Sequence, residues 1–106
     1  MAKRLKGWDV YVRDCQRDPV ELPLPGDEVI TVTMPTGGRT RAFNRAMRAG
    51  DETALVTALF GEKDGRRILD LYEDAPGNVL TEVVNDVLRE FGMAQDQVGD
   101  SAASSS

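Results

Sequence analysis

The side chains that could do chemistry in this sequence are carboxylates, arginines, lysines and one thiol, because histidine is absent. Histidine is the commonest general base and the commonest metal ligand among the side chains, so its absence removes the usual candidate for both roles. Cys15 is the only cysteine, so the sequence offers no intrachain disulfide, cysteine zinc cluster or Cys-His nucleophilic pair. We expect Cys15 to be a small, partly buried side chain rather than a reactive thiol.

The carboxylates are numerous but follow no catalytic or metal-binding spacing. Asp70, Glu73 and Asp74 cluster near the end of a predicted helix, without the alternating oxygen ligands of a calcium loop. Residues 61–65, Gly-Glu-Lys-Asp-Gly, lack the preceding strand and the Gly-Lys-Ser/Thr order of a phosphate-binding loop, so we interpret them as a helix-helix connection. The sequence therefore predicts no catalytic residue, no metal site and no cofactor, and we expect that the protein is not an enzyme.

Charge is distributed unevenly along the chain. Residues 1–50 carry nine Lys and Arg against six Asp and Glu, a net charge of +3, and residues 51–106 carry four against twelve, a net charge of −8, which together give −5. Because basic clusters attract a phosphate backbone, the acidic half is a poor surface for nucleic acid, and we expect no nucleic-acid partner. No apolar run approaches the roughly 20 residues that cross a bilayer, and residues 1–7 lack a signal-peptide core, so we expect a cytoplasmic protein without membrane contact.

Alternation of apolar and polar residues predicts strands in the first third of the chain. Residues 8–12, Trp-Asp-Val-Tyr-Val, alternate and contain aromatic and β-branched side chains, which predicts a short strand. Residues 20–24 alternate again, but their proline confines them to an edge or extended segment, and residues 25–27, Pro-Gly-Asp, predict a turn. Residues 28–34 have the highest β-branched content. We expect a short β-hairpin or strand pair between about residues 8 and 34.

After Pro35 the period of apolar residues changes from about 2 to about 3.6, which predicts three to four helices between about residues 38 and 92. Capping residues and glycines mark the helix ends. The expected limits are Thr36 or Thr40 to Gly50, Asp51 to Gly61, about 62 to 73, and Pro76 to Gly92. Gly65, inside the third helix, costs about 1 kcal/mol of helix propensity.

Length and composition indicate one domain. At 106 residues, with 41% apolar and 29% charged residues, the chain has the balance of one globular domain. We expect an α+β, mainly α fold, in which a short N-terminal β-hairpin packs on three to four helices. Residues 1–7 are expected to be a flexible leader, residues 8–93 the domain, and residues 94–106, which end in a serine-rich run, a disordered C-terminal tail.

Two features of the predicted helices are candidate binding surfaces. Their apolar faces are expected to form the core and, where part of a face stays exposed, a groove for a partner protein or an oligomer contact. The candidate partner-binding or oligomer residues are Phe43, Met47, Leu55, Leu59, Phe60, Val83, Val87, Leu88 and Phe91. Arg41, Arg45 and Arg48 recur at helical spacing, and they predict either a solvated face or an electrostatic docking surface for an acidic partner.

Residues 19–93 resemble a known family in the positions of their prolines and glycines and in the spacing of their apolar residues. The segments concerned are Glu21-Leu22-Pro23-Leu24-Pro25, Met34-Pro35-Thr36-Gly37, Ala42-Phe43, Ala58-Leu59-Phe60-Gly61-Glu62, Ile68-Leu69-Asp70-Leu71 and Pro76-Gly77-Asn78-Val79, followed by Val83, Val87, Phe91 and Gly92. In these segments the chain resembles the tail assembly chaperones of siphoviruses that infect actinobacteria.

The resemblance implies a non-catalytic factor of the host cell cytoplasm that is absent from the mature virion. Such a chaperone binds the tape measure protein and keeps its apolar segments soluble while the tail tube protein polymerises around it. Members of the family are often made in two forms, the longer by a ribosomal frameshift, and this chain would be the short form. We also expect the protein to self-associate.

Two alternatives to a chaperone are open at the level of sequence. In the first, the two helices joined at residues 49–51 form a helix-turn-helix DNA-binding regulator, in which Thr53 and Thr57 read bases and the arginines contact phosphates. In the second, the protein is a structural component of the phage head or tail, and it remains in the finished particle.

Overall fold

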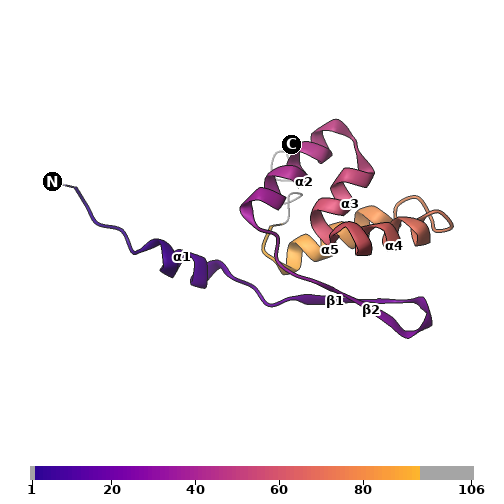
Figure 1. Cartoon of the computed structure of the whole chain (residues 1–106), viewed down its shortest axis with the longest axis horizontal. Coiled ribbons are helices and arrows are strands. Elements are labelled where there is room, and N and C mark those ends of the chain that lie inside the picture. Colours follow the sequence, from indigo (N-terminus) through magenta and orange to yellow (C-terminus); the bar gives the residue numbers. More distant parts are fainter. Residues whose placement is uncertain (1, 94–106) are drawn as a thin grey trace, which may run out of the picture.

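A computed structural model describes residues 2–93 of the chain as a mainly helical α+β fold (Figure 1). In chain order the elements are α1 (Trp8–Cys15), β1 (Val20–Leu24), the 3₁₀ turn η1 (Pro25–Asp27), β2 (Glu28–Val32), α2 (Gly37–Ala49), α3 (Glu52–Phe60), α4 (Glu62–Tyr72) and α5 (Val79–Glu90). The predicted fold class, a short hairpin with helices, is confirmed. The predicted disordered tail, residues 94–106, lies outside the described residues, as does Met1 of the predicted leader.

The hairpin forms where the alternating, β-branched segments predicted it. Strands β1 and β2 pair antiparallel, with Leu22 opposite Ile30. Gly26 has a φ of +79° and Asp27 a φ of +65°, so the chain reverses through two left-handed residues. Glycine adopts that conformation without strain, and aspartate tolerates it better than most residues do. Ile30 and Val32 alternate onto the buried face of the hairpin, where they join the core.

Residues 8–12 form part of helix α1, so the predicted strand at this position is wrong. Trp8, Tyr11, Val12 and Cys15 follow one another at i, i+3, i+4 and i+7, the spacing of one helix face. The five residues that suggested alternation were too short a window to reveal this period. Lys6 supports the helix locally, since its Nζ lies 3.1 Å from a carboxylate oxygen of Asp14.

The ends of α2 and α3 are set by local hydrogen bonds at the predicted residues. Thr36 caps α2, where its hydroxyl accepts a hydrogen bond from the Arg39 backbone N–H at 3.2 Å. Asp51 caps α3 in the same way, accepting from the Ala54 N–H at 3.1 Å. Gly50 ends α2 with a φ of +70°. Such caps satisfy backbone groups that a helix terminus leaves unpaired.

Helix α5 begins at Val79, three residues after the predicted start at Pro76. Residues 76–78 form a turn instead, in which the Val79 N–H donates to the Pro76 carbonyl at 3.0 Å. The Tyr72 hydroxyl donates to the Gly77 carbonyl at 2.6 Å, which holds this turn against the end of α4. The predicted stop is confirmed, because Gly92 has a φ of +72°.

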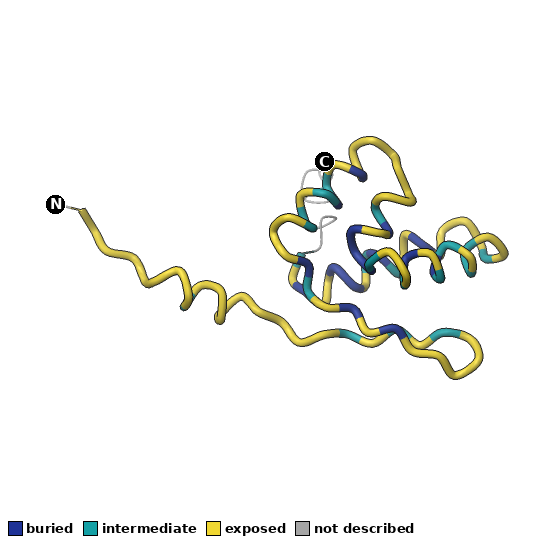
Figure 2. Tube along the Cα trace, viewed as in Figure 1, coloured by how far each residue is buried: buried dark blue, intermediate teal, exposed yellow. Residues whose placement is uncertain are grey.

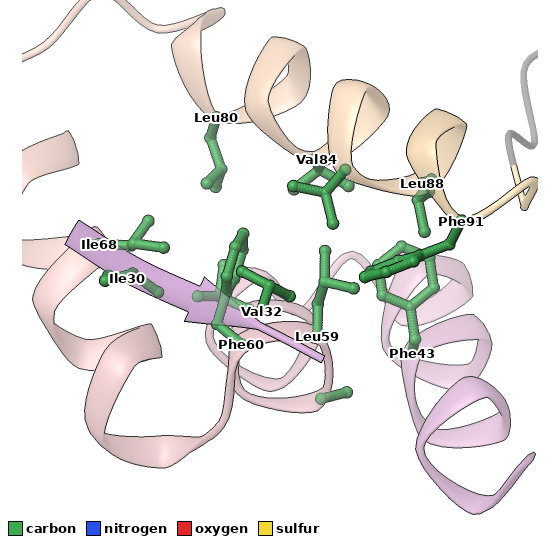
Figure 3. Packing of buried hydrophobic residues seen from close by; sticks show 13 residues of the cluster. Ile30, Val32, Phe43, Leu59, Phe60, Ile68, Leu80, Val84, Leu88 and Phe91 are labelled. Atoms are coloured by element: carbon green, nitrogen blue, oxygen red, sulfur yellow. The ribbon is translucent and has the colours of Figure 1, made fainter. Parts of the chain in front are cut away.

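The core lies between the buried face of the hairpin and helices α2 to α5 (Figures 2 and 3). Its buried side chains are Ile30, Val32, Phe43, Val56, Ala58, Leu59, Phe60, Ile68, Leu80, Val84, Val87, Leu88 and Phe91. Figure 3 shows Phe43 of α2 and Phe91, just after α5, side by side near Leu59 of α3. The apolar stripe of α5 therefore closes the fold over the other helices.

Helices α3 and α4 approach closely because α4 carries a glycine at the contact. A Cβ atom at Gly65 would lie 3.2 Å from Val56 Cγ1 and 3.2 Å from the Val56 carbonyl oxygen. Gly65 is itself buried. The absence of a side chain at Gly65 thus allows the two helices to pack closely, at the cost of some helix propensity.

Candidate protein-binding surfaces

Six of the nine predicted partner-binding side chains are core residues in this structure. Phe43, Leu59, Phe60, Val87, Leu88 and Phe91 are each less than a tenth exposed. A partner could reach Leu59, Phe60, Val87 and Phe91 only if a helix moved away from the fold, whereas Phe43 and Leu88 lie at the floor of a groove. The apolar helix faces of the sequence therefore correspond mostly to the interior, and the surface available to a partner lies elsewhere.

Met47 and Leu55 of the predicted set line an open groove between α2, α3 and α5. Met47 is 41% exposed and Leu55 is half-buried. The groove, which we call the α2–α5 groove, has a volume of about 200 Å³. Its lining residues are Phe43, Met47, Glu52, Leu55, Leu80, Thr81, Val84, Asn85 and Leu88.

Val83, the ninth predicted residue, lines a second and more apolar groove between the hairpin, α4 and α5. This groove, which we call the hairpin groove, has a volume of about 280 Å³. Its lining residues are Leu22, Pro23, Leu24, Pro25, Ile68, Leu71, Tyr72, Ala75, Val79, Leu80 and Val83. Most of these side chains are half-buried, so their apolar atoms meet solvent at the floor of the groove.

The most exposed apolar side chains described lie at the N-terminus, where no binding residue was predicted. Leu5 is 70% exposed and Trp8 is 80% exposed, and Tyr11 and Val12 are also exposed. These four residues form the arm face, and residues 2–18, which carry it, form the arm. Figure 2 shows the arm as an exposed segment that projects from the folded body. The helical spacing of Trp8, Tyr11 and Val12 was the sequence signal for this surface.

Among the arginines of α2, the structure separates Arg39 from the rest. Arg41, Arg45 and Arg48, the predicted docking stripe, are all exposed. Arg39 instead reaches the C-terminus of α3, where its Nε donates to the Ala58 carbonyl at 2.9 Å and its Nη2 to the Leu59 carbonyl at 2.7 Å. The exposed three remain a predicted electrostatic surface.

A polar cleft of about 660 Å³ lies between the hairpin and α4. Arg67 of α4 crosses it, donating through Nε to a Glu28 carboxylate oxygen at 3.1 Å. The hydrogen bond and the negative charge of Glu28 raise the pKa of the Arg67 guanidinium above its usual range. The pair joins β2 to α4, so we assign it a structural role.

The acidic side chains of the described residues stay dispersed over the fold. Within residues 2–93, no three His, Cys, Asp or Glu side chains gather closely enough to hold a metal ion. The thiol of Cys15 is exposed, whereas we had expected it to be partly buried. The reason is that α1, on which it lies, buries none of its residues and projects away from the rest of the described fold (Figure 1).

Comparison with models of protein families, with curated proteins and with solved structures finds no match to this chain. Among the described residues, no helix is both long and apolar enough to cross a membrane. The candidate surfaces are thus the arm face, the hairpin groove and the α2–α5 groove, all of them apolar and open.

Proposed function

We propose that this protein is a non-catalytic tail assembly chaperone that grips apolar segments of a tape measure protein through its arm face. The observation that carries the proposal is the exposure of Trp8 and Val12 on a helix that contributes nothing to the core, with the exposed Leu5 just before it. Exposed apolar surface of this kind is characteristic of protein-binding sites. The resemblance of residues 19–93 to siphovirus tail assembly chaperones supplies the client and the setting, the host cell cytoplasm before the virion is complete.

The chemistry of the arm suits an apolar client segment. Trp8 and Tyr11 offer large apolar surfaces with a polar edge, a combination enriched at protein interfaces. The arm joins the body through residues 16–19, which are outside any helix or strand, so it can present its face to segments of different shape. The net charge of −5 favours solubility while the arm face is exposed.

Coexpression with the tape measure protein from the same genome tests this proposal. We expect the chain to raise the soluble fraction of the tape measure protein, and the double variant Trp8→Ala, Val12→Ser to lose most of that effect. Val29→Ser is the matched control, because Val29 is also exposed but lies on β2, outside the arm. An unchanged soluble fraction with the natural chain would exclude the chaperone function.

A structural role in the head or tail makes a different prediction. A chaperone is absent from the mature virion, whereas a structural component persists in it. Mass spectrometry of purified virions should therefore detect the tape measure protein and the tail tube protein without this chain. Its presence in stoichiometric amount would favour the structural role over ours.

The DNA-binding alternative is favoured by one feature, the turn between α2 and α3 that Gly50 makes beside exposed arginines. Against it stands the composition of α3, which would be the recognition helix. Its exposed residues are Glu52, Thr53, Ala54 and Thr57, without a lysine or arginine to bind guanine or phosphate. A salt-dependent mobility shift with duplex DNA would support this alternative, and we expect none.

A further inference from the structure

We propose that the arm of one copy docks its Trp8 and Val12 side chains in the hairpin groove of a second copy. The proposal refines the self-association that belongs to the proposed function, since it names the two surfaces that meet. Exchange of the arms in both directions gives a closed dimer with two-fold symmetry. In that dimer each copy covers the apolar face that it would offer to a client.

The first argument is that α1 requires a surface to pack on. It has 8 residues, and none of them is buried in the single copy. Isolated helices shorter than about 12–15 residues are marginal in water, because helical stability in proteins comes mainly from packing of an apolar face. Docking in an apolar groove supplies that packing for Trp8, which is 80% exposed.

The second argument is charge, which distinguishes the two apolar grooves. Residues 2–18 carry five Lys and Arg against three Asp, a net charge of +2. The hairpin groove is bordered by acidic segments: residues 20–32 carry three carboxylates and no cation, and residues 62–90, which span α4 and α5, carry eight carboxylates against four Lys and Arg. Helix α2, which borders the α2–α5 groove, carries four arginines and no carboxylate. Glu52 of α3 lines the α2–α5 groove, so the contrast rests on α2, and we expect the basic arm to be attracted more strongly to the hairpin groove than to the other.

The third argument concerns the direction of the arm, which favours a second copy over the arm's own body. Leu22 to Pro25 line the hairpin groove, at the end of β1 nearest the turn. The arm leaves β1 at the opposite end and points away from the body (Figure 1). Residues 16–19 reach at most about 14 Å when extended, and to bring α1 back they would also have to reverse direction. Docking on a second copy needs no such reversal.

Trp8 provides the readout, because it is the only tryptophan of the chain. Its emission shifts to shorter wavelength when the indole leaves water for an apolar groove. We expect this shift to grow with protein concentration, in parallel with the conversion of monomer to dimer seen by size-exclusion chromatography with light scattering. A monomer at all concentrations, or a shift that does not depend on concentration, would overturn the proposal, the latter in favour of docking within one copy.

Mixing two variants tests the docking partners directly. Trp8→Ala keeps the groove but loses the anchor and all tryptophan emission. Val79→Glu keeps the arm and places a carboxylate in the groove. Val79 is 36% exposed at the first position of α5, where a carboxylate is compatible with the helix. Each variant alone should be monomeric, with circular dichroism showing that it is folded.

Adding an excess of Trp8→Ala to Val79→Glu should restore the shift of tryptophan emission to shorter wavelength. The reason is that the intact arm of Val79→Glu, which carries Trp8, can enter the intact groove of Trp8→Ala. The matched control Met47→Glu alters the α2–α5 groove at a similarly exposed residue, and it should dimerise like the natural chain. If the mixture shows no shift, or if Met47→Glu is the variant that loses the dimer, the proposed contact is wrong.

The result is separable from that of the chaperone test, since the mixing experiment uses only this chain. If Val79→Glu loses the dimer but still keeps the tape measure protein soluble, the hairpin groove serves self-association alone. The arm face would then serve both self-association and client binding. Failure of the mixing experiment would leave the coexpression result standing.

Discussion

The Arg39 guanidinium connects the start of α2 to the end of α3. Its two hydrogen bonds go to carbonyls of Ala58 and Leu59, which lie in the last turn of α3 and lack intrahelical partners. A positive charge at that position also interacts favourably with the helix dipole. The sequence placed Arg39 beside the arginine stripe of α2, but it could not show that this one side chain turns inward.

Replacing Arg39 by alanine should lower the free energy of unfolding by about 1.5–3 kcal/mol, since charged hydrogen bonds to half-buried carbonyls are lost. Arg39→Lys should recover only part of that, because an ammonium group does not reproduce the fork of donors. Urea denaturation followed by circular dichroism measures both. The control Arg41→Ala, at an exposed residue of the same helix, should stay within about 0.5 kcal/mol of the natural chain.

Gly65 and Gly38 should respond in opposite directions to alanine. Alanine improves helix propensity by about 1 kcal/mol at either residue. At Gly65 the new methyl group would meet Val56 at 3.2 Å, including a backbone oxygen that cannot easily move, so we expect net destabilisation. At Gly38, in the first turn of α2, the nearest atom lies at 3.9 Å, so we expect a gain. The melting temperatures of the two variants, measured by thermal unfolding, test both expectations. A melting temperature of Gly65→Ala above that of the natural chain would contradict the close contact between α3 and α4.

At the scale of elements, the features that could be predicted are those encoded within a few neighbouring residues. Thr36, Asp51 and Gly50 set helix ends through bonds to residues three to five positions away, so their residue types sufficed. The hairpin was predictable for the same reason, from its β-branched strands and its Pro-Gly-Asp turn. Helix α1 was missed because alternation and helical spacing coincide over five residues.

The candidate site could be predicted less well than the fold. An apolar stripe shows that a helix face avoids water, but it does not show whether the cover comes from the same chain or from a partner. Leu59, Val87 and Phe91 are covered by their own fold, while Met47 and Val83 border open grooves. Only the arrangement of the helices in space separates the two groups.

The arm and Phe91, just after α5, should differ sharply in what they contribute to stability. Trp8→Ala with Val12→Ser should leave the melting temperature of a dilute, monomeric sample unchanged, because α1 buries none of its residues. Phe91→Ala removes a ring that is only 2% exposed, and it should cost about 3–5 kcal/mol. Circular dichroism melts compare the two. A large loss in the arm variant would mean that the arm packs on its own body.

For the molecule as a whole, the uneven charge gives the proposed dimer a dependence on salt. A basic arm against an acidic groove is attracted over a distance that shortens as ions are added, with a Debye length of about 10 Å at 0.1 M salt and about 3 Å at 1 M. The dissociation constant, from sedimentation equilibrium, should therefore rise between these two conditions. A constant that falls with added salt would show that apolar contact alone drives association.

Pro23 protects the outer edge of the two-stranded sheet against pairing with a further strand. It lies in the middle of β1, opposite Val29. A proline within a strand is accommodated where its nitrogen faces away from the neighbouring strand, so the outer side of β1 lacks a backbone donor there. An extended foreign segment would find an interrupted ladder at this edge, which discourages amyloid-like stacking of strands on the hairpin.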